Sequence, residues 1–284
     1  MIDIIKNITS SRFIISKLEK TCDSVTVEKN GTIVGYVKGS TDEAPIMLAT
    51  HTELPHFVCM NADEGEITLH YAGPTGDNKW VNCPIISRFG VRGIITTCDE
   101  KITALVDTKE RKVQIGDIFY TDVDLLEVDD NVLLHGISTL GPAASLLRCT
   151  EGFTVSRPKR DLYFVFTADG QYGYGQYATA AKFNGASEVV CFGAVSNDDA
   201  QEVCVRLCDR SFSSDKKTSE KLISCGAIPL VLREGKCASS AIQLAGIPVS
   251  QVDIPVKNIG TLRESAENGH LLFLSFLIFE FCNK

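Results

Sequence analysis

The sequence predicts an α/β fold that is interrupted by a small β-rich insertion. After His135, short apolar runs alternate with helix-like stretches, which is typical of strands and helices that follow each other along the chain. From about residue 61 to residue 130 the pattern changes to short alternating runs between Gly, Asp and Asn turns, without helical periodicity. We therefore expect an α/β domain made of residues 1–60 and 131–284, with an inserted β-barrel-like domain over residues 61–130.

The composition is that of a soluble globular protein, with 44% hydrophobic and 23% charged residues among 284. The formal net charge of −8 argues against nucleic-acid partners, because nothing offsets repulsion from phosphates. The longest apolar stretch, Leu271–Phe279, is too short to span a membrane, and no secretion signal precedes Phe13. The eleven cysteines are odd in number and contain no CxxC, which indicates buried thiols in a reducing compartment. A cytoplasmic location is expected.

The first segment, before the insertion, reads as one broken helix and three strands. Apolar positions over the first twenty residues predict a helix, broken near Ser10 or Ser11. Val25–Val27 and Thr32–Val37 flank an Asn-Gly turn, the strongest short-range signal for a hairpin. Pro45–Ala49 is a continuous apolar run that indicates a buried strand, and His51 follows it directly.

The insertion and the segment after it complete the expected elements. The predicted strands of the insertion are Glu66–Tyr71, Val81–Ser87, Val91–Thr97, Ile102–Val106 and Asp117–Tyr120. The later strands are expected at Leu162–Thr167, Ser187–Phe192, Val203–Leu207, Pro229–Leu232 and Pro248–Ile254. Helices are expected to start near Ala143 with Pro142 in the first turn, and to cover Gln176–Phe183, Ser219–Ser224, Ala238–Leu244 and, at the end, Thr261–Phe281.

Few residues show a catalytic pattern of their own. His51 with Glu53 two residues on is how many sites place a metal ligand beside an orienting carboxylate, although on this pair alone a hydrogen-bonded strand-end histidine is the favoured interpretation. The turn Gly173–Ala178 formally matches a dinucleotide fingerprint, but it begins too far beyond the preceding strand. No serine stands in a nucleophile elbow.

Taken in order, several features resemble the glutamyl or tetrahedral (deblocking) aminopeptidases, a family often labelled endoglucanase. They are His51, the β-rich insertion, His135-Gly-Ile-Ser, the strand Tyr163–Thr167, and Ala245-Gly-Ile-Pro-Val followed by Ile254-Pro255. The resemblance extends over nearly the whole chain. It implies a mixed-sheet zinc-aminopeptidase-like α/β domain with helices on both faces, a dinuclear zinc or cobalt site, and an inserted barrel that helps assemble large homo-oligomers.

The first two family metal positions fall before and after the insertion. The resemblance implies that His51 is a metal ligand, with Glu53 in place of the family's Asp behind it. The Asp that bridges both metals in the family falls at or beside Leu140. Only the first of these two positions keeps a side chain that can bind a metal ion.

The remaining family positions fall in the second half of the chain. The pair of glutamates, general base and then ligand, falls at Gly170 and Gln171. The Asp that ends the next strand falls near Gly193, and the last His falls at Gly260, with a Glu four residues later at Glu264. His51 is therefore the only retained ligand, while Gln171 and Glu264 remain as candidate contacts for a peptide or amino acid.

These replacements predict a degenerate metal site. Two divalent ions about 3.5–4 Å apart need an anionic bridge, which leucine does not supply. Without a carboxylate at position 170, the family's base is missing, and Asp169 is the only neighbouring substitute. Metal binding is expected to be weak or absent.

Beside nucleotide binding at Gly173–Ala178, two functions remain open from the sequence. The first is an aminopeptidase-like pseudoenzyme that acts as a peptide-binding or assembly subunit, in a homo-oligomer (a dimer or larger shell) or with an intact paralogue. The second is an active metal-dependent aminopeptidase or other hydrolase with a rearranged or mononuclear site around His51, Glu53 and Asp169.

Overall fold

The structure, a computed structural model, describes residues 1–74, 80–109, 111–168, 177, 181, 185–233 and 237–284. These residues form two compact units. One contains residues 1–53, 138–257 and 266–284, and the other contains residues 54–137 and 258–265. We call them the sheet unit and the barrel unit.

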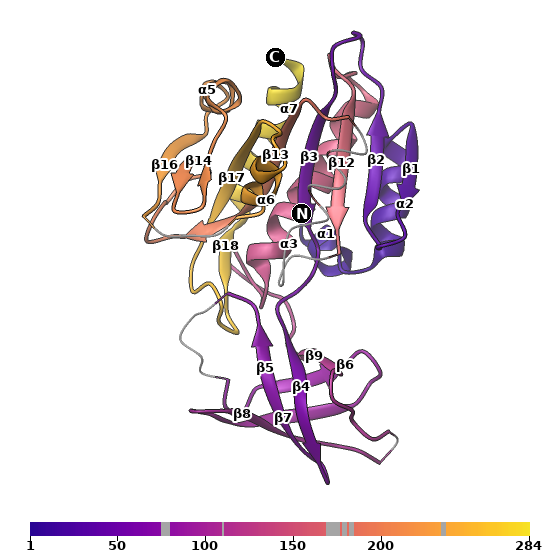
Figure 1. The fold of residues 1–284 in the computed structure, drawn as a ribbon, viewed down its shortest axis with the longest axis vertical. Coiled ribbons are helices and arrows are strands. Elements are labelled where there is room, and N and C mark those ends of the chain that lie inside the picture. The colour runs from indigo at the N-terminus through magenta and orange to yellow at the C-terminus, as the bar shows by residue number, and fades with distance from the viewer. Residues whose placement is uncertain (75–79, 110, 169–176, 178–180, 182–184, 234–236) are drawn as a thin grey trace. The chain divides into compact units, whose positions relative to one another are not determined.

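The sheet unit is built on a nine-stranded mixed sheet (Figure 1). Its strand order is β1-β2-β12-β3-β13-β17-β14-β15, with β16 paired to β14. The strand bounds are β1 Ser24–Val27, β2 Ile33–Val37, β3 Ile46–His51, β12 Leu162–Thr167, β13 Glu188–Ser196, β14 Cys204–Asp209, β15 Phe212–Ser213, β16 Ile228–Val231 and β17 Val249–Val256. The central strands β12, β3, β13 and β17 run parallel, and β2 and β14 flank them in the antiparallel direction.

Both faces of the sheet are covered. On one face, Met47, Ala49 and Val165 pack with Tyr177 and Ile242 of the covering helical segments. On the other, the ring of Phe164 contacts Phe153, which in turn contacts Phe279 of the last helix. The helices are α1 Ile2–Asn7, α2 Ser11–Thr21, α3 Ile137–Cys149, the 3₁₀ turn η1 Thr150–Thr154, α5 Lys216–Ser224, α6 Ser239–Leu244 and α7 Asn268–Asn283. Continuous burial explains why the central strands read as unbroken apolar runs.

The barrel unit contains a closed six-stranded barrel in the order β4-β5-β8-β7-β6-β9. Its strands are β4 His56–Asp63, β5 Glu66–Ala72, β6 Pro84–Ser87, β7 Arg92–Cys98, β8 Ile102–Val106 and β9 Ile118–Thr121, followed by the hairpin β10 Leu126–Val128 and β11 Asn131–Leu133. Closure pairs both edges of a sheet that would otherwise be open. Trp80, Phe57 and Phe119 fill the interior.

The sequence-based fold class is confirmed, whereas the starts of two helices are wrong. Helix α3 begins at Ile137, directly after Gly136 with its positive φ of 84°, so Pro142 lies inside the helix and not in its first turn. The last helix begins at Asn268, not Thr261, because Asn258 and Gly260 adopt positive φ in a turn and Ser265–Glu267 forms the short strand β18. The helix expected over Gln176–Phe183 lies, apart from residues 177 and 181, outside the described residues.

Candidate functional site

His51 stands at the C-terminal end of β3, the edge of a parallel sheet at which open α/β folds place their ligands. Its partner in register on β12 is Thr167, so the two strands end level with each other. The side chain lies on the same face as Ala49, two residues earlier, and therefore on the face of the core that contains Met47 and Tyr177. Sheet geometry thus presents the imidazole at the expected position.

The imidazole of His51 is neutral at physiological pH. Burial lowers its pKa to about 4, and the nearby carboxylate of Glu53 raises it only in part. The Nδ1 atom is buried and has no hydrogen-bond partner among the described residues. Glu53 itself is half-buried in the segment after β3. A neutral imidazole with a nitrogen that makes no hydrogen bond can accept a proton or bind an electrophile.

The next family position, Leu140, lies in α3 and is 2% exposed. The surrounding stretch, residues 131–150, contains neither Asp nor Glu, so a shift of several positions in the correspondence would not supply a carboxylate. The described chain has no acidic side chain at or beside this position that could bridge two metal ions.

Gly193 lies on β13, in register with Asp253 on β17. Cys191 on β13 pairs with Ala49 on β3. Gly193 lies two residues after Cys191, and His51 lies two residues after Ala49. Gly193 and His51 therefore end up level on the sheet, on the same face. A Cβ at position 193 would lie 2.8 Å from Gln251 Nε2 and 3.0 Å from Asp253 Oδ1, so the glycine leaves room for these two buried side chains.

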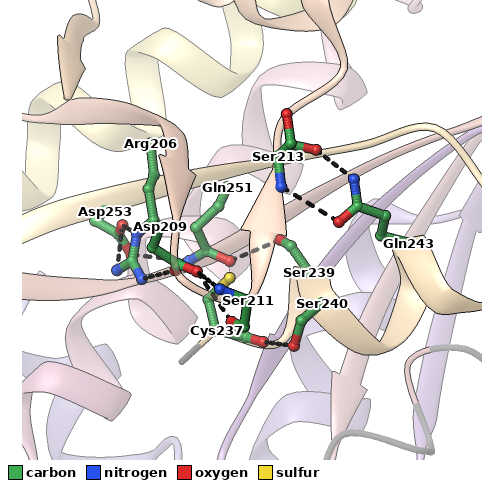
Figure 2. Close-up of polar contacts among 10 residues, drawn as sticks. All are labelled: Arg206, Asp209, Ser211, Ser213, Cys237, Ser239, Ser240, Gln243, Gln251 and Asp253. Atoms are coloured by element: carbon green, nitrogen blue, oxygen red, sulfur yellow. Dashed lines mark hydrogen bonds and ion pairs between the residues drawn. The ribbon is translucent and has the colours of Figure 1, made fainter. Parts of the chain in front are cut away.

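Asp253 belongs to a buried network that the sequence did not reveal (Figure 2). Its Oδ2 accepts from Arg206 Nε at 2.8 Å and lies 2.7 Å from Arg206 Nη2, while its Oδ1 accepts from Gln251 Nε2 at 2.8 Å. Arg206 Nη1 donates to Asp209 Oδ2 at 3.0 Å, and Ser239 Oγ donates to Gln251 Oε1 at 2.8 Å. We call Arg206, Asp209, Asp253, Gln251 and Ser239 the guanidinium network.

Burial makes the guanidinium network electrostatically strong. The Arg206 side chain is 5% exposed, and those of Asp253 and Asp209 are 1% and 0% exposed. Burial by itself would lower the pKa of Arg206, but the two carboxylates raise it. Burial would likewise raise the pKa of Asp209, whereas hydrogen bonds from Ser211 and Arg206 hold it below its ordinary value. Arg206 and Asp209 are therefore charged.

A signal for this network was present in the sequence. Arg206 and Asp253 are single charged residues inside two predicted apolar strands, Val203–Leu207 and Pro248–Ile254. A charge on a buried strand needs a partner of opposite sign, so the two residues could have been paired. Their separation of 47 residues and the antiparallel placement of β14 beside β17 are what sequence reasoning could not supply.

The last family positions lie in the barrel unit. Gly260, with a positive φ of 79°, donates its N–H to Glu264 Oε1 at 2.8 Å. Glu264 is fully buried, and its backbone carbonyl accepts from the N–H of Leu134 at 3.0 Å. Asp169, Gly170 and Gln171 lie outside the described residues, as does the turn Gly173–Ala178 except for Tyr177. Within the described part of the chain, no group of three His, Cys, Asp or Glu could hold a metal ion.

The site can be compared with the dinuclear zinc or cobalt centre that the resemblance implies. Such a centre needs several convergent anionic ligands. At the described positions, leucine and two glycines supply none, and both oxygens of Asp253, the carboxylate in register with Gly193, are engaged within the protein. The described residues therefore do not fit a pair of metal ions.

Comparisons with known proteins bear on the fold. No family model matches the sequence, and no curated protein matches it. An aminopeptidase from the archaeon Desulfurococcus kamchatkensis superposes with a TM-score of 0.88 at 17% identity, over 99% of this chain and 94% of that one. A Thermotoga maritima protein described as an endoglucanase gives a TM-score of 0.78 at 14% identity, over 96% and 91%.

A third structure adds a precedent for assembly. The TET1 peptidase of Pyrococcus horikoshii, described as able to assemble into a tetrahedron or a large octahedral shell, superposes with a TM-score of 0.81 at 15% identity. The match covers 96% of this chain and 93% of that one. None of the described helices is long and apolar enough to cross a membrane.

The three superpositions show that the chain has the fold of the tetrahedral aminopeptidases, which are also described as endoglucanases. The resemblance seen in the sequence is confirmed at the level of fold.

Proposed function

We propose that this protein is an aminopeptidase-like protein that does not carry out dinuclear metal catalysis and acts as a peptide-binding or assembly subunit. The observation that carries the proposal is Gly193. It stands where the family resemblance places a metal-ligating aspartate, and the space that a side chain would need is taken by Gln251 and Asp253. The absence of any acidic residue from position 131 to position 150 supports the same conclusion for the bridging ligand.

The assembly role is supported by what the similar structures do. The Pyrococcus horikoshii TET1 peptidase can assemble into a tetrahedron or a large octahedral shell. We propose that this chain forms a homo-oligomer or assembles with an intact paralogue, and that the barrel unit contributes to the contacts. Glu264, and Gln171 outside the described residues, are the proposed contacts for a bound peptide or amino acid.

A second candidate function is favoured by one observation at His51. Its buried Nδ1 has no partner among the described residues, and its ring is neutral, which is the state in which histidine binds a metal ion. A hydrolase with a mononuclear site around His51, Glu53 and Asp169 would use this nitrogen. In the first candidate function, His51 binds no metal ion.

The two candidates differ in metal content and turnover. The protein is stripped with a chelator, reconstituted with Zn²⁺ or Co²⁺, and its bound metal is measured by plasma mass spectrometry beside the variant His51→Ala. We expect far less than one ion per chain in both proteins, and no release of N-terminal residues from a peptide library. One ion per chain that is lost in His51→Ala, together with chelator-sensitive turnover, would establish the second candidate instead.

A further inference from the structure

The guanidinium network is more deeply buried than the other ion pairs among the described residues of the sheet unit. The Arg160–Glu188 pair, with an Nη1–Oε2 distance of 2.6 Å, keeps side chains that are 17% and 15% exposed. The side chains of Arg206, Asp209 and Asp253 are at most 5% exposed. A buried arginine between two buried carboxylates costs desolvation free energy that simple packing does not require.

We propose that Arg206 is an internal cation that occupies the place of a metal ion beside Gly193 and excludes divalent cations from this part of the sheet. This inference rests on the proposed function, because it explains why the sheet has a glycine, Gly193, where the family resemblance places a metal-ligating residue. The guanidinium lies between Asp209 and Asp253, with Nη1 directed to one and Nε and Nη2 to the other (Figure 2). Carboxylate oxygens in such a pair are the ligands that hard divalent cations prefer.

The amide of Gln251 couples this network to Gly193. Its oxygen accepts from Ser239 Oγ and its nitrogen donates to Asp253 Oδ1, each at 2.8 Å. Moving the amide away from position 193 breaks two buried hydrogen bonds, which is costly. A side chain at position 193 and the guanidinium network therefore exclude each other, so an aspartate placed there alone would not restore a metal ligand.

The formal charge of the network is consistent with a cation-holding role. Arg206 contributes one positive charge against the negative charges of Asp209 and Asp253, so one negative charge remains. Hydrogen bonds from the Ser211 N–H at 2.7 Å and the Ser211 hydroxyl at 2.9 Å, both to Asp209 Oδ1, stabilise it. Removing the guanidinium leaves two buried carboxylates that repel each other and have no cation.

The test removes the internal cation and offers another. Arg206→Met is expected to lower Tm by roughly 10 °C, as breaking a buried ion pair does, and millimolar Mg²⁺ or Ca²⁺ should recover part of the loss while leaving the wild-type Tm unchanged. Arg160→Met is the matched control. Its Tm should fall less, because that pair is less buried, and should not respond to the cations.

The outcomes separate the inference from the proposed function. A Tm of Arg206→Met that does not respond to cations, or that responds no more than Arg160→Met, overturns the inference. If Arg206→Met is not recovered folded, refolding is compared with and without Mg²⁺ or Ca²⁺; recovery only with cations supports the inference, and recovery in neither overturns it. Zn²⁺ or Co²⁺ bound by the wild-type protein would instead end the proposed function.

A double-mutant cycle tests the link to Gly193. Gly193→Ala should lower Tm in the wild-type background, because the new Cβ meets the Gln251 amide at 2.8 Å. The same change should cost clearly less in a Gln251→Ala background, where that contact is gone. Equal losses of Tm in both backgrounds would show that the glycine is independent of the network and would refute the coupling.

Discussion

At the scale of single residues, the barrel unit contains a histidine whose protonation opposes folding. His135 is 4% exposed; its Nε2 lies 3.2 Å from the hydroxyl of Tyr71, and its Nδ1 lies 2.9 Å from the hydroxyl of Thr121. The ring of Trp80 packs against it in an edge-on arrangement at 5.3 Å. Burial lowers the pKa of His135 from 6.5 to about 4, and no carboxylate is among the causes that shift it.

This shift predicts how stability depends on pH. Because the folded pKa lies below the unfolded one, the contribution of His135 is fully present above pH 6.5 and is lost as pH falls toward 4. Linkage gives a loss of about 2 kcal/mol in the free energy of unfolding between about pH 7.5 and about pH 5. Urea unfolding at both pH values should show that His135→Gln loses less than the wild type by this amount.

The control for this prediction is His70→Gln, since His70 is exposed on β5 of the same unit. It should keep the wild-type pH dependence. If His135→Gln loses as much stability on acidification as the wild type, the burial of a neutral His135 is not what makes folding sensitive to acid.

Other residue-scale features show what the sequence could and could not supply. The resemblance alone implies that Leu140, Gly193 and Gly260 replace metal-binding side chains, and none of these three residues has a side chain that can bind a metal ion. The occupation of the space at Gly193 does not, because it depends on the register between β13 and β17 and on an arginine 47 residues before its partner. Register is a tertiary property that strand periodicity does not encode.

At the scale of elements, the central strands of the sheet were predictable because burial on both faces leaves continuous apolar runs, and the barrel strands because one buried face leaves alternating runs. The β2–β12 and β3–β13 neighbours are far apart in sequence, however, and no local pattern gives their order in the sheet. Helix starts failed where tertiary structure overrides local signals. Pro142 indicates a first turn, yet α3 extends five residues before it, although Pro142 lacks the N–H that would donate to the carbonyl of Ser138.

The strand β16 illustrates how one residue protects an element. It pairs with β14 on one side only among the described strands, and its Ile228 and Val231 side chains are 51% and 63% exposed. The N–H of Ile228 donates to the carbonyl of Val203, toward β14, so the next residue, Pro229, faces the open side. A proline there costs no ladder bond and blocks the addition of a further strand.

Replacing Pro229 should therefore promote association rather than unfolding. Pro229→Val restores an outward N–H beside two exposed apolar side chains, and we expect a higher mass than wild type at high protein concentration by light scattering, with Tm nearly unchanged. Pro229→Lys is the matched control, since it restores the N–H but adds a charge that guards the edge. A wild-type mass for Pro229→Val at every concentration would contradict this role of the proline.

At the scale of the whole molecule, the proposed assembly needs a surface on the barrel unit. One candidate is a row of paired residues on the outside of the barrel. Ile94 pairs with Pro84 on one side and with Leu105 on the other, and Leu105 also pairs with Glu66. Ile94 and Leu105 are 42% and 53% exposed, which leaves a directly paired apolar patch in contact with solvent. Such a patch is favourable when another chain covers it.

The assembly proposal predicts the mass of the protein in solution. Light scattering should give a mass several times that of the 31.0 kDa chain, and Leu105→Lys should lower it, because a lysine in the covered patch would be buried without a partner. Val155→Lys is the control, since Val155 is 90% exposed and belongs to the sheet unit and not to a barrel strand. Circular dichroism verifies that both variants remain folded. A wild-type mass of one chain would refute the homo-oligomer, whereas an unchanged mass in Leu105→Lys would refute only this face of the barrel.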